Sequence, residues 1–199
     1  MIKGRHPKQP GTTQLSIFSM NRISQIDPTT ATGKAQKLFT TVQSQLGFVP
    51  NLMRVLGNSP AVLEGFLSFS GALAAGLLSP KLRTQIALAV AEIDGCGYCL
   101  SIHTVLGGTT GLSPDEVTEA RRVAASDEKS NAALKFVRAI MLQRGLIADC
   151  ELLAARNAGL SDAEIVEVVA HVALNILTNY TNGVARTVID FPEMKPGEL

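Results

Sequence analysis

Apolar residues recur at helical spacing along most of the chain. In its last third, Ile165, Val168 and Val172 fall near one face of a long helix. Residues 33–47 and 127–144 repeat this spacing, which predicts two further amphipathic helices. No stretch alternates apolar and polar side chains between turn signals, so we expect no strands. The pattern predicts an all-α bundle of about eight helices.

Serine residues mark the expected helix starts. Three of them follow a leucine and precede residues that favour a helix N-terminus: Ser79, Ser113 and Ser161. Glu116 and Glu164 stand at capping-box spacing from the second and third of these serines. A fourth start is predicted at Ser59. The repeated pattern also suggests an internal duplication, with residues 78–111 and 146–185 as two helix pairs of similar design.

Composition and charge narrow the class of protein. The chain has 199 residues, of which 46% are hydrophobic, and this is enough for one well-filled core. Its formal net charge is +1, so no strong field would attract nucleic acid or an anionic membrane. No apolar run reaches the roughly 20 residues that a membrane helix needs. We therefore expect neither nucleic acid nor membrane as a partner.

The N-terminal residues differ in character from the rest. Residues 1–19 contain basic residues, prolines and threonines and lack the apolar core of a secretory signal. We interpret them as a disordered extension and residues 20–199 as a single helical domain, with Met20 as an alternative start.

The segment DGCGYCLSIH, residues 94–103, concentrates the reactive side chains. Asp94–Gly95 should end one helix, and a new helix should begin at or just after Cys96. Helical geometry then puts Cys96, Cys99 and His103 on one face. A sulfur at a helix N-terminus favours the thiolate, and a second sulfur one turn later can close a disulfide. His103 would carry protons for this pair.

These residues resemble a known family. The motif CGYCLSIH, with its flank LSPKLRTQIALAVAEIDG and the closing stretch NILTNYTNGVARTVIDFP, is similar to the carboxymuconolactone decarboxylase superfamily. Within it, the sequence looks closest to the alkylhydroperoxidase D (AhpD)-like, peroxidase-related branch. The resemblance covers about residues 23–192.

The resemblance implies an AhpD-like helical fold, a homo-oligomer, and a dithiol that reduces hydroperoxides with electrons from a thiol reductant or redox protein. It implies no cofactor and no metal. By position, Cys99 would react with the peroxide and Cys96 would resolve the intermediate. The helix-terminus argument instead favours Cys96 as the reactive thiolate, so the assignment of the two sulfurs stays open.

One position departs from the family. Its members commonly carry a glutamate of the proton relay twelve residues before the first cysteine, where this chain has Thr84. A hydroxyl can pass a hydrogen bond but is no carboxylate base near neutral pH. Glu92, one turn before Cys96 at the end of the preceding helix, is our candidate replacement carboxylate.

Other functions remain as alternatives. A zinc site would need a fourth ligand beside the two cysteines and His103, with His171 or Cys150 as candidates. Lactone decarboxylation, as in the superfamily name, makes no use of a dithiol. A non-enzymatic scaffold that senses redox state through its oligomer is a third possibility.

For most of the remaining polar residues, structural roles are expected rather than chemical ones. Tyr98 either borders the pocket or packs, and Cys150 is expected to be a small buried hydrophobe. His171 is interpreted as a core or interface histidine. Three asparagines share one helix face, either lining the pocket or, as we favour, locking helix packing: Asn175, Asn179 and Asn182. With unpaired cysteines in CxxC spacing, we expect a cytoplasmic protein.

Overall fold

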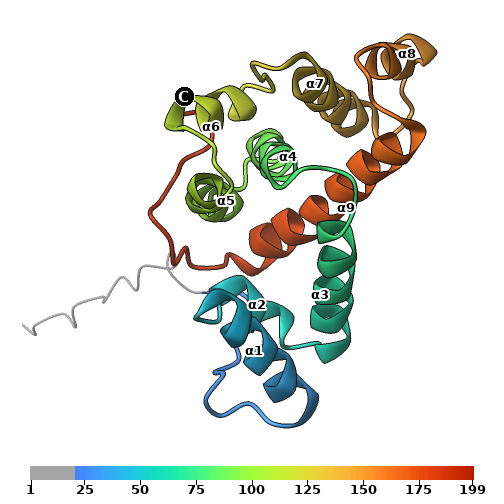
Figure 1. Ribbon diagram of the computed structural model, residues 1–199. Coiled ribbons are helices and arrows are strands. Elements are labelled where there is room, and N and C mark those ends of the chain that lie inside the picture. The colour runs from blue at the N-terminus through green and yellow to red at the C-terminus, as the bar shows by residue number, and fades with distance from the viewer. Residues whose placement is uncertain (1–20) are drawn as a thin grey trace, which may run out of the picture.

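The computed structural model describes residues 21–199, which form nine α-helices and no strand (Figure 1). In chain order they are α1 (Gly33–Leu46), α2 (Asn51–Leu56), α3 (Pro60–Ala74), α4 (Pro80–Ile93), α5 (Gly97–Thr109), α6 (Pro114–Arg121), α7 (Glu128–Gln143), α8 (Asp149–Asn157) and α9 (Asp162–Ala185). The expected all-α class is confirmed. The extension expected over residues 1–19 lies outside the described residues, and the domain boundary at residue 20 stays a prediction.

The predicted helix starts occur where the serines stand. The hydroxyls of Ser79, Ser113 and Ser161 each accept the N–H of the third residue onward, and the latter two complete capping boxes. Ser59 precedes α3 as expected, but its hydroxyl makes no capping hydrogen bond. The short α2 was not foreseen, because six residues are too few to show a helical repeat.

Helix α4 lies at the centre of the bundle (Figure 1), where it packs against α5, α6, α7 and α9. Ile86, Leu88 and Val90 on this helix have no exposed surface. Residues 86–91 are all apolar, and a helical stretch of this kind is stable only when neighbours cover it on every side. The central position of α4 therefore holds α5, with its two cysteines, beside α9.

The two segments proposed as a duplication differ in their packing. α4 packs along α5, whereas α8 packs on α7 rather than along α9. The similar starts at Ser79 and Ser161 therefore reflect the general chemistry of helix caps and not a repeated helix pair.

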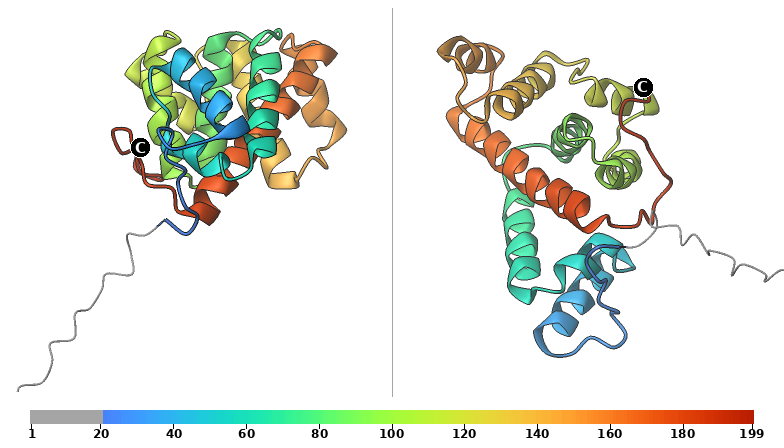
Figure 2. Two further views of the ribbon diagram at one scale, coloured as in Figure 1. Left: turned by 90° about the horizontal axis from the view of Figure 1, so that it is seen from below. Right: turned by 180° about the vertical axis from the view of Figure 1, so that it is seen from behind.

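Helices α1, α2 and α3 form a group on one side of the molecule, which Figure 2 also shows from behind. Within it, α3 packs on α1 and α9, and α2 packs on α9. Phe39, Val42 and Leu63 are buried there. This group supplies one wall of the pocket described below.

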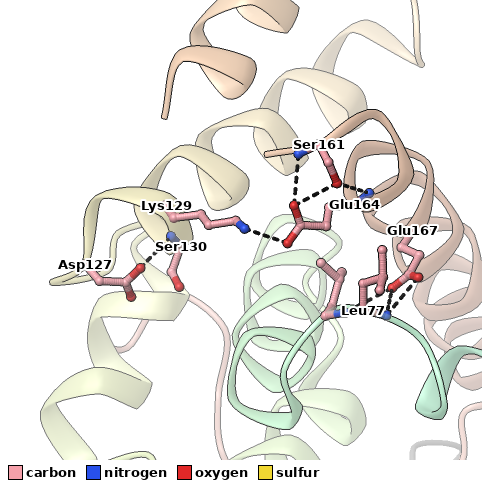
Figure 3. A network of polar contacts seen from close by, with 8 residues as sticks. Leu77, Asp127, Lys129, Ser130, Ser161, Glu164 and Glu167 are labelled. Carbon is pink, nitrogen blue, oxygen red and sulfur yellow. Dashed lines mark hydrogen bonds and ion pairs between the residues drawn. The ribbon is translucent and has the colours of Figure 1, made fainter. Parts of the chain in front are cut away.

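Two glutamates of α9 fix this helix against its neighbours (Figure 3). Glu164 accepts a hydrogen bond from Lys129 Nζ of α7 at 2.6 Å. Glu167 accepts the backbone N–H groups of Leu77 at 2.8 Å and Leu78 at 3.0 Å. α9 is thereby tied both to α7 and to the loop that leads into α4.

The C-terminal segment closes over the ends of α4 and α6. The Arg121 side chain, only 3% exposed, donates to Glu92 at 2.8 Å and to the carbonyl of Lys195 at 2.9 Å. The N–H of Gly197 donates to the second oxygen of Glu92 at 2.6 Å. The carboxylate of Glu92 is thus fully occupied by partners. Among residues 21–199, no helix is long and apolar enough to cross a membrane.

Candidate active site

The helix break expected at Asp94–Gly95 is confirmed. Gly95 has a φ of 68°, a left-handed conformation that glycine adopts without strain. Helix α5 begins at Gly97, and Cys96 is its N-cap residue, whose sulfur accepts the N–H of Cys99 at 3.3 Å. The dithiol therefore lies at the N-terminus of α5.

The pKa values of the two buried thiols are shifted in opposite directions. The hydrogen bond from the Cys99 thiol lowers the pKa of Cys96, and the N–H of Cys99 lowers it further against the effect of burial. The bond to Cys96, together with burial, raises the pKa of Cys99. The helix N-terminus also favours negative charge at Cys96. The pair therefore carries its first negative charge on Cys96, as the helix-terminus argument predicts.

A row of polar side chains on α9 faces the dithiol. Asn182 Nδ2 donates to Cys99 Sγ at 3.3 Å, and Asn179 Nδ2 donates to a carboxylate oxygen of Asp94 at 2.9 Å. Asn175 lines the pocket beside Cys99. Of the two roles considered for these asparagines, pocket lining therefore applies to Asn175. Asn179 and Asn182 do not line the pocket and instead join α9 to Asp94 and to α5, which agrees with the packing role.

A pocket of about 340 Å³ opens beside Cys99. Side chains of α1, α2, α3, α4, α5 and α9 line it, and most of them are apolar. Cys99 and His103 are among these residues, whereas Cys96 is not. A mostly apolar pocket of this size with a few polar groups is typical of small-molecule sites.

His103 contributes a neutral imidazole to the pocket. It is half-buried, and burial lowers its pKa to about 4. The ring is therefore unprotonated near neutral pH and can accept a proton.

Thr84 and Glu92, the two residues considered in place of the relay glutamate, lie in different parts of the structure. Thr84 lines the pocket, where its hydroxyl donates to the carbonyl of Pro80 at 3.0 Å and accepts from the Thr110 hydroxyl at 3.3 Å. Glu92 does not line the pocket, because its carboxylate is bound by Arg121 and by the C-terminal backbone. The structure thus gives no support to Glu92 as the replacement carboxylate.

Tyr98 packs behind the pocket wall and does not line the pocket. Its hydroxyl accepts the N–H of Leu52 at 3.1 Å, and its ring meets the edge of Phe191 at a centroid distance of 5.8 Å. Burial raises the pKa of Tyr98, so the phenol stays protonated. Since Leu52 lines the pocket, Tyr98 supports the wall from outside.

Two pocket residues, His171 and Arg83, were not predicted as site residues from the sequence. His171 is buried as expected, but it faces the pocket and its Nε2 has no hydrogen-bond partner. Its position one turn before Asn175 on the polar row of α9 was the available signal. Arg83 had no comparable signal, because its place in the pocket depends on how α4 packs.

Cys150 lies apart from the dithiol. It is exposed, at a shallow hollow between α7 and α8, so the expectation of a buried cysteine is wrong. No group of three or more metal-binding side chains occurs among the described residues, and the zinc alternative gains no support from them.

Several solved structures share this fold. An alkylhydroperoxidase AhpD core, an uncharacterized peroxidase-related protein from Ralstonia eutropha JMP134, matches with a TM-score of 0.78 and 20% identity, over 86% of this chain and 93% of that one. A peroxidase-related protein from Silicibacter sp. TM1040 gives 0.73 and 22%, over 86% and 94%. The debrominase Bmp8 in complex with 2,3,4-tribromopyrrole gives 0.73 and 21%, over 85% and 91%. At these identities the likeness establishes the AhpD-like fold.

The sequence itself also matches a family. Residues 60–141, from α3 into α7, fit the carboxymuconolactone decarboxylase family. The segment that matches contains Cys96, Cys99 and His103, so these residues of the candidate site lie inside the part of the chain that is similar to the family. No protein of curated function matches the chain.

Proposed function

We propose that this protein is a thiol-dependent oxidoreductase of the carboxymuconolactone decarboxylase superfamily, and that it reduces hydroperoxides through Cys96 and Cys99. One observation carries the proposal: a sulfur of a free dithiol lines an apolar pocket that also holds the neutral imidazole of His103. Such a pocket suits a small organic hydroperoxide, and the dithiol suits a two-electron reduction.

The location of the pocket favours Cys99 as the sulfur that attacks. Its proton passes to the Cys96 thiolate, which accepts the hydrogen bond of the Cys99 thiol. Because the two sulfurs share one proton, they titrate as a pair, and a Cys99 thiolate is accessible although the charge rests mainly on Cys96. Asn182 then stabilises the charge on Cys99 through its hydrogen bond to the sulfur.

The reaction proceeds in two bond exchanges. The Cys99 thiolate attacks the terminal peroxide oxygen, an S–O bond forms and the O–O bond breaks, which leaves a sulfenic acid and an alkoxide. The alkoxide takes up the proton that Cys96 received from Cys99, with His103 as the carrier beside the pocket, and Cys96 is a thiolate again. The Cys96 thiolate then attacks the sulfenic sulfur and releases hydroxide, which leaves as water after protonation.

Over the cycle, one hydroperoxide and two thiols give an alcohol, water and a disulfide. An external thiol reductant or redox protein then reduces the disulfide by thiol exchange. Thr84 lies in the pocket as a hydrogen-bonding group, and the proton transfer in this scheme needs no carboxylate.

The alternatives make different demands on the dithiol. Lactone decarboxylation would survive alkylation of both cysteines, and a redox-sensing scaffold would form the disulfide without catalytic turnover. Debromination is a further candidate, because one structure of similar fold belongs to a debrominase with a bromopyrrole bound. An apolar pocket beside a thiol also suits that chemistry.

The test is consumption of cumene hydroperoxide by the purified protein with dithiothreitol, for wild type, Cys96→Ser and Cys99→Ser. Cys150→Ser is the matched control, since Cys150 is exposed and far from the pocket. We expect turnover in wild type and Cys150→Ser and none in Cys99→Ser. Cys96→Ser should turn over more slowly than wild type, because dithiothreitol can reduce the sulfenic acid on Cys99 directly. Full turnover in Cys99→Ser would refute the mechanism, and activity on 2,3,4-tribromopyrrole alone would favour debromination.

We also propose a homo-oligomer and a cytoplasmic location, as expected from the sequence. The oligomer gains support from apolar side chains that α3 and α9 expose: Val62, Phe69, Val166 and Val169. Light scattering on the purified protein tests the subunit number, and a monomeric mass would contradict the oligomer.

A further inference from the structure

An unpartnered histidine faces the pocket opposite the thiol chemistry. His171 of α9 is 5% exposed, and its Nε2 is buried without a hydrogen-bond partner. Buried polar atoms nearly always have a partner, and an orphan at a pocket wall indicates a group that a ligand supplies. His171 lines the same pocket as Cys99 and His103.

A cation without a carboxylate partner lines the same pocket. Arg83 donates through Nη1 to the carbonyls of Leu73 at 3.3 Å and Ala74 at 2.6 Å, and it makes no ion pair with the described residues. These carbonyls orient the guanidinium but leave its charge uncompensated, and its remaining N–H groups have no protein partner among the described residues.

The pocket contains no acidic side chain among the residues that line it. The nearest relevant carboxylate, Glu167, lies one turn before His171 but accepts the backbone N–H groups of Leu77 and Leu78 (Figure 3). It is therefore held away from the pocket lining. The pocket therefore has a positively charged region with hydrogen-bond donors at Arg83 and His171, and its other walls are mostly apolar.

We propose that Arg83 and His171 bind the carboxylate of an amphipathic substrate whose apolar body fills the pocket and whose reducible group meets Cys99. The substrate class is an apolar carboxylic acid, and in the proposed reaction it is a carboxylic acid hydroperoxide. That reaction rests on the proposed function, whereas carboxylate binding does not.

The chemistry of the two groups fits a carboxylate. A guanidinium donates two parallel hydrogen bonds to a carboxylate, and this geometry is selective for planar anions. Burial, and then the charge of Arg83, lowers the pKa of His171, so this ring stays neutral and donates a hydrogen bond from one nitrogen. Opposite charge in a largely apolar pocket is screened less than at the surface, which favours anion binding there.

The first test measures binding without turnover. Isothermal titration of the reduced protein with octanoate and with octanol compares an anionic and a neutral head on the same chain. We expect octanoate to bind at least about tenfold more tightly than octanol. Arg83→Gln and His171→Leu should lose this preference, and Arg83→Lys should keep part of it because the charge remains.

The control has the same change of charge elsewhere. Arg138→Gln alters an exposed residue of α7 outside the pocket and should leave octanoate binding unchanged. Equal loss in Arg138→Gln would show an effect of net charge and overturn the proposal, as would equal affinity of wild type for octanoate and octanol.

The second test uses turnover of a fatty acid hydroperoxide and of its methyl ester. In Arg83→Gln we expect the ratio of KM for the acid to KM for the ester to rise about tenfold, and turnover of the ester shows that the variant is folded. An equal fall of kcat for both substrates would instead identify a proton-transfer role and overturn the binding role. If the wild type binds octanoate but reduces no hydroperoxide, the proposed function fails and this inference stands.

Discussion

The two ends of α4 present opposite electrostatic environments. At the C-terminal end, Glu92 is held by the buried Arg121 and by the C-terminal backbone. At the N-terminal end, Arg83 and Thr84 face a pocket whose lining contains no carboxylate. Glu92, the carboxylate considered for the proton relay, is thus part of a structural ion pair. Proton transfer in the pocket is left to histidine and hydroxyl groups.

The largest expected effect comes from breaking the ion pair at the C-terminal end. Glu92→Ala leaves the Arg121 charge buried without its partner and should cost about 3 kcal/mol or more of the free energy of unfolding. Urea unfolding measures this loss. Hydroperoxide turnover of the folded variant should equal that of wild type.

The same variant separates the two roles of Glu92. A large fall in kcat with unchanged stability would mean that Glu92 belongs to the proton relay, against the arrangement described. Glu92→Gln serves as the control, because its amide oxygen keeps one of the two hydrogen-bond acceptors and it should lose less stability than Glu92→Ala.

A smaller effect concerns the neutral histidine at the pocket end. The folded-state pKa of His103 is about 4, below the unfolded value of about 6.5, so the unfolded state binds more protons in this range. The free energy of unfolding therefore decreases as pH falls from the unfolded towards the folded pKa of His103. This histidine should contribute a loss of about 2 kcal/mol between about pH 7 and about pH 5. Urea unfolding of wild type and His103→Gln at both pH values measures the contribution of His103 to this pH dependence. An equal pH dependence in the two proteins would contradict a neutral buried His103.

The smallest expected effect concerns Thr84. Thr84→Val removes the acceptor of the Thr110 hydrogen bond while keeping the volume, and should change stability by about 1 kcal/mol and turnover by less than about tenfold. Steady-state kinetics and thermal unfolding measure both. Complete loss of turnover would show that this hydroxyl is an essential relay group in place of the family's glutamate.

Local signals predicted much of the fold. The caps at Ser79, Ser113 and Ser161 and the break at Gly95 depend on a few neighbouring residues, and all occur as expected. The position of Cys96 at a helix N-terminus follows from the same short-range rules. The short helix α2 escaped because its formation depends on packing against α3 and α9.

The site depends on contacts between distant segments, and here the sequence was less informative. Glu92 meets Arg121 across 29 positions, so its distance from Cys96 along the chain indicated nothing about the pocket. Asn182 reaches Cys99 across 83 positions, and His171 reaches the pocket from the same helix. Only the packing of α9 against α5 brings these side chains together.

The most direct test of the account is mass spectrometry after reduced protein meets one equivalent of hydroperoxide in the presence of dimedone, which captures sulfenic acids. The account predicts a disulfide between Cys96 and Cys99 in wild type. It predicts a dimedone adduct on Cys99 in Cys96→Ser, and no adduct at the dithiol in Cys99→Ser. An adduct on Cys96 in Cys99→Ser with none on Cys99 in Cys96→Ser would contradict Cys99 as the attacking sulfur. No oxidation of either cysteine in wild type would contradict the dithiol mechanism itself.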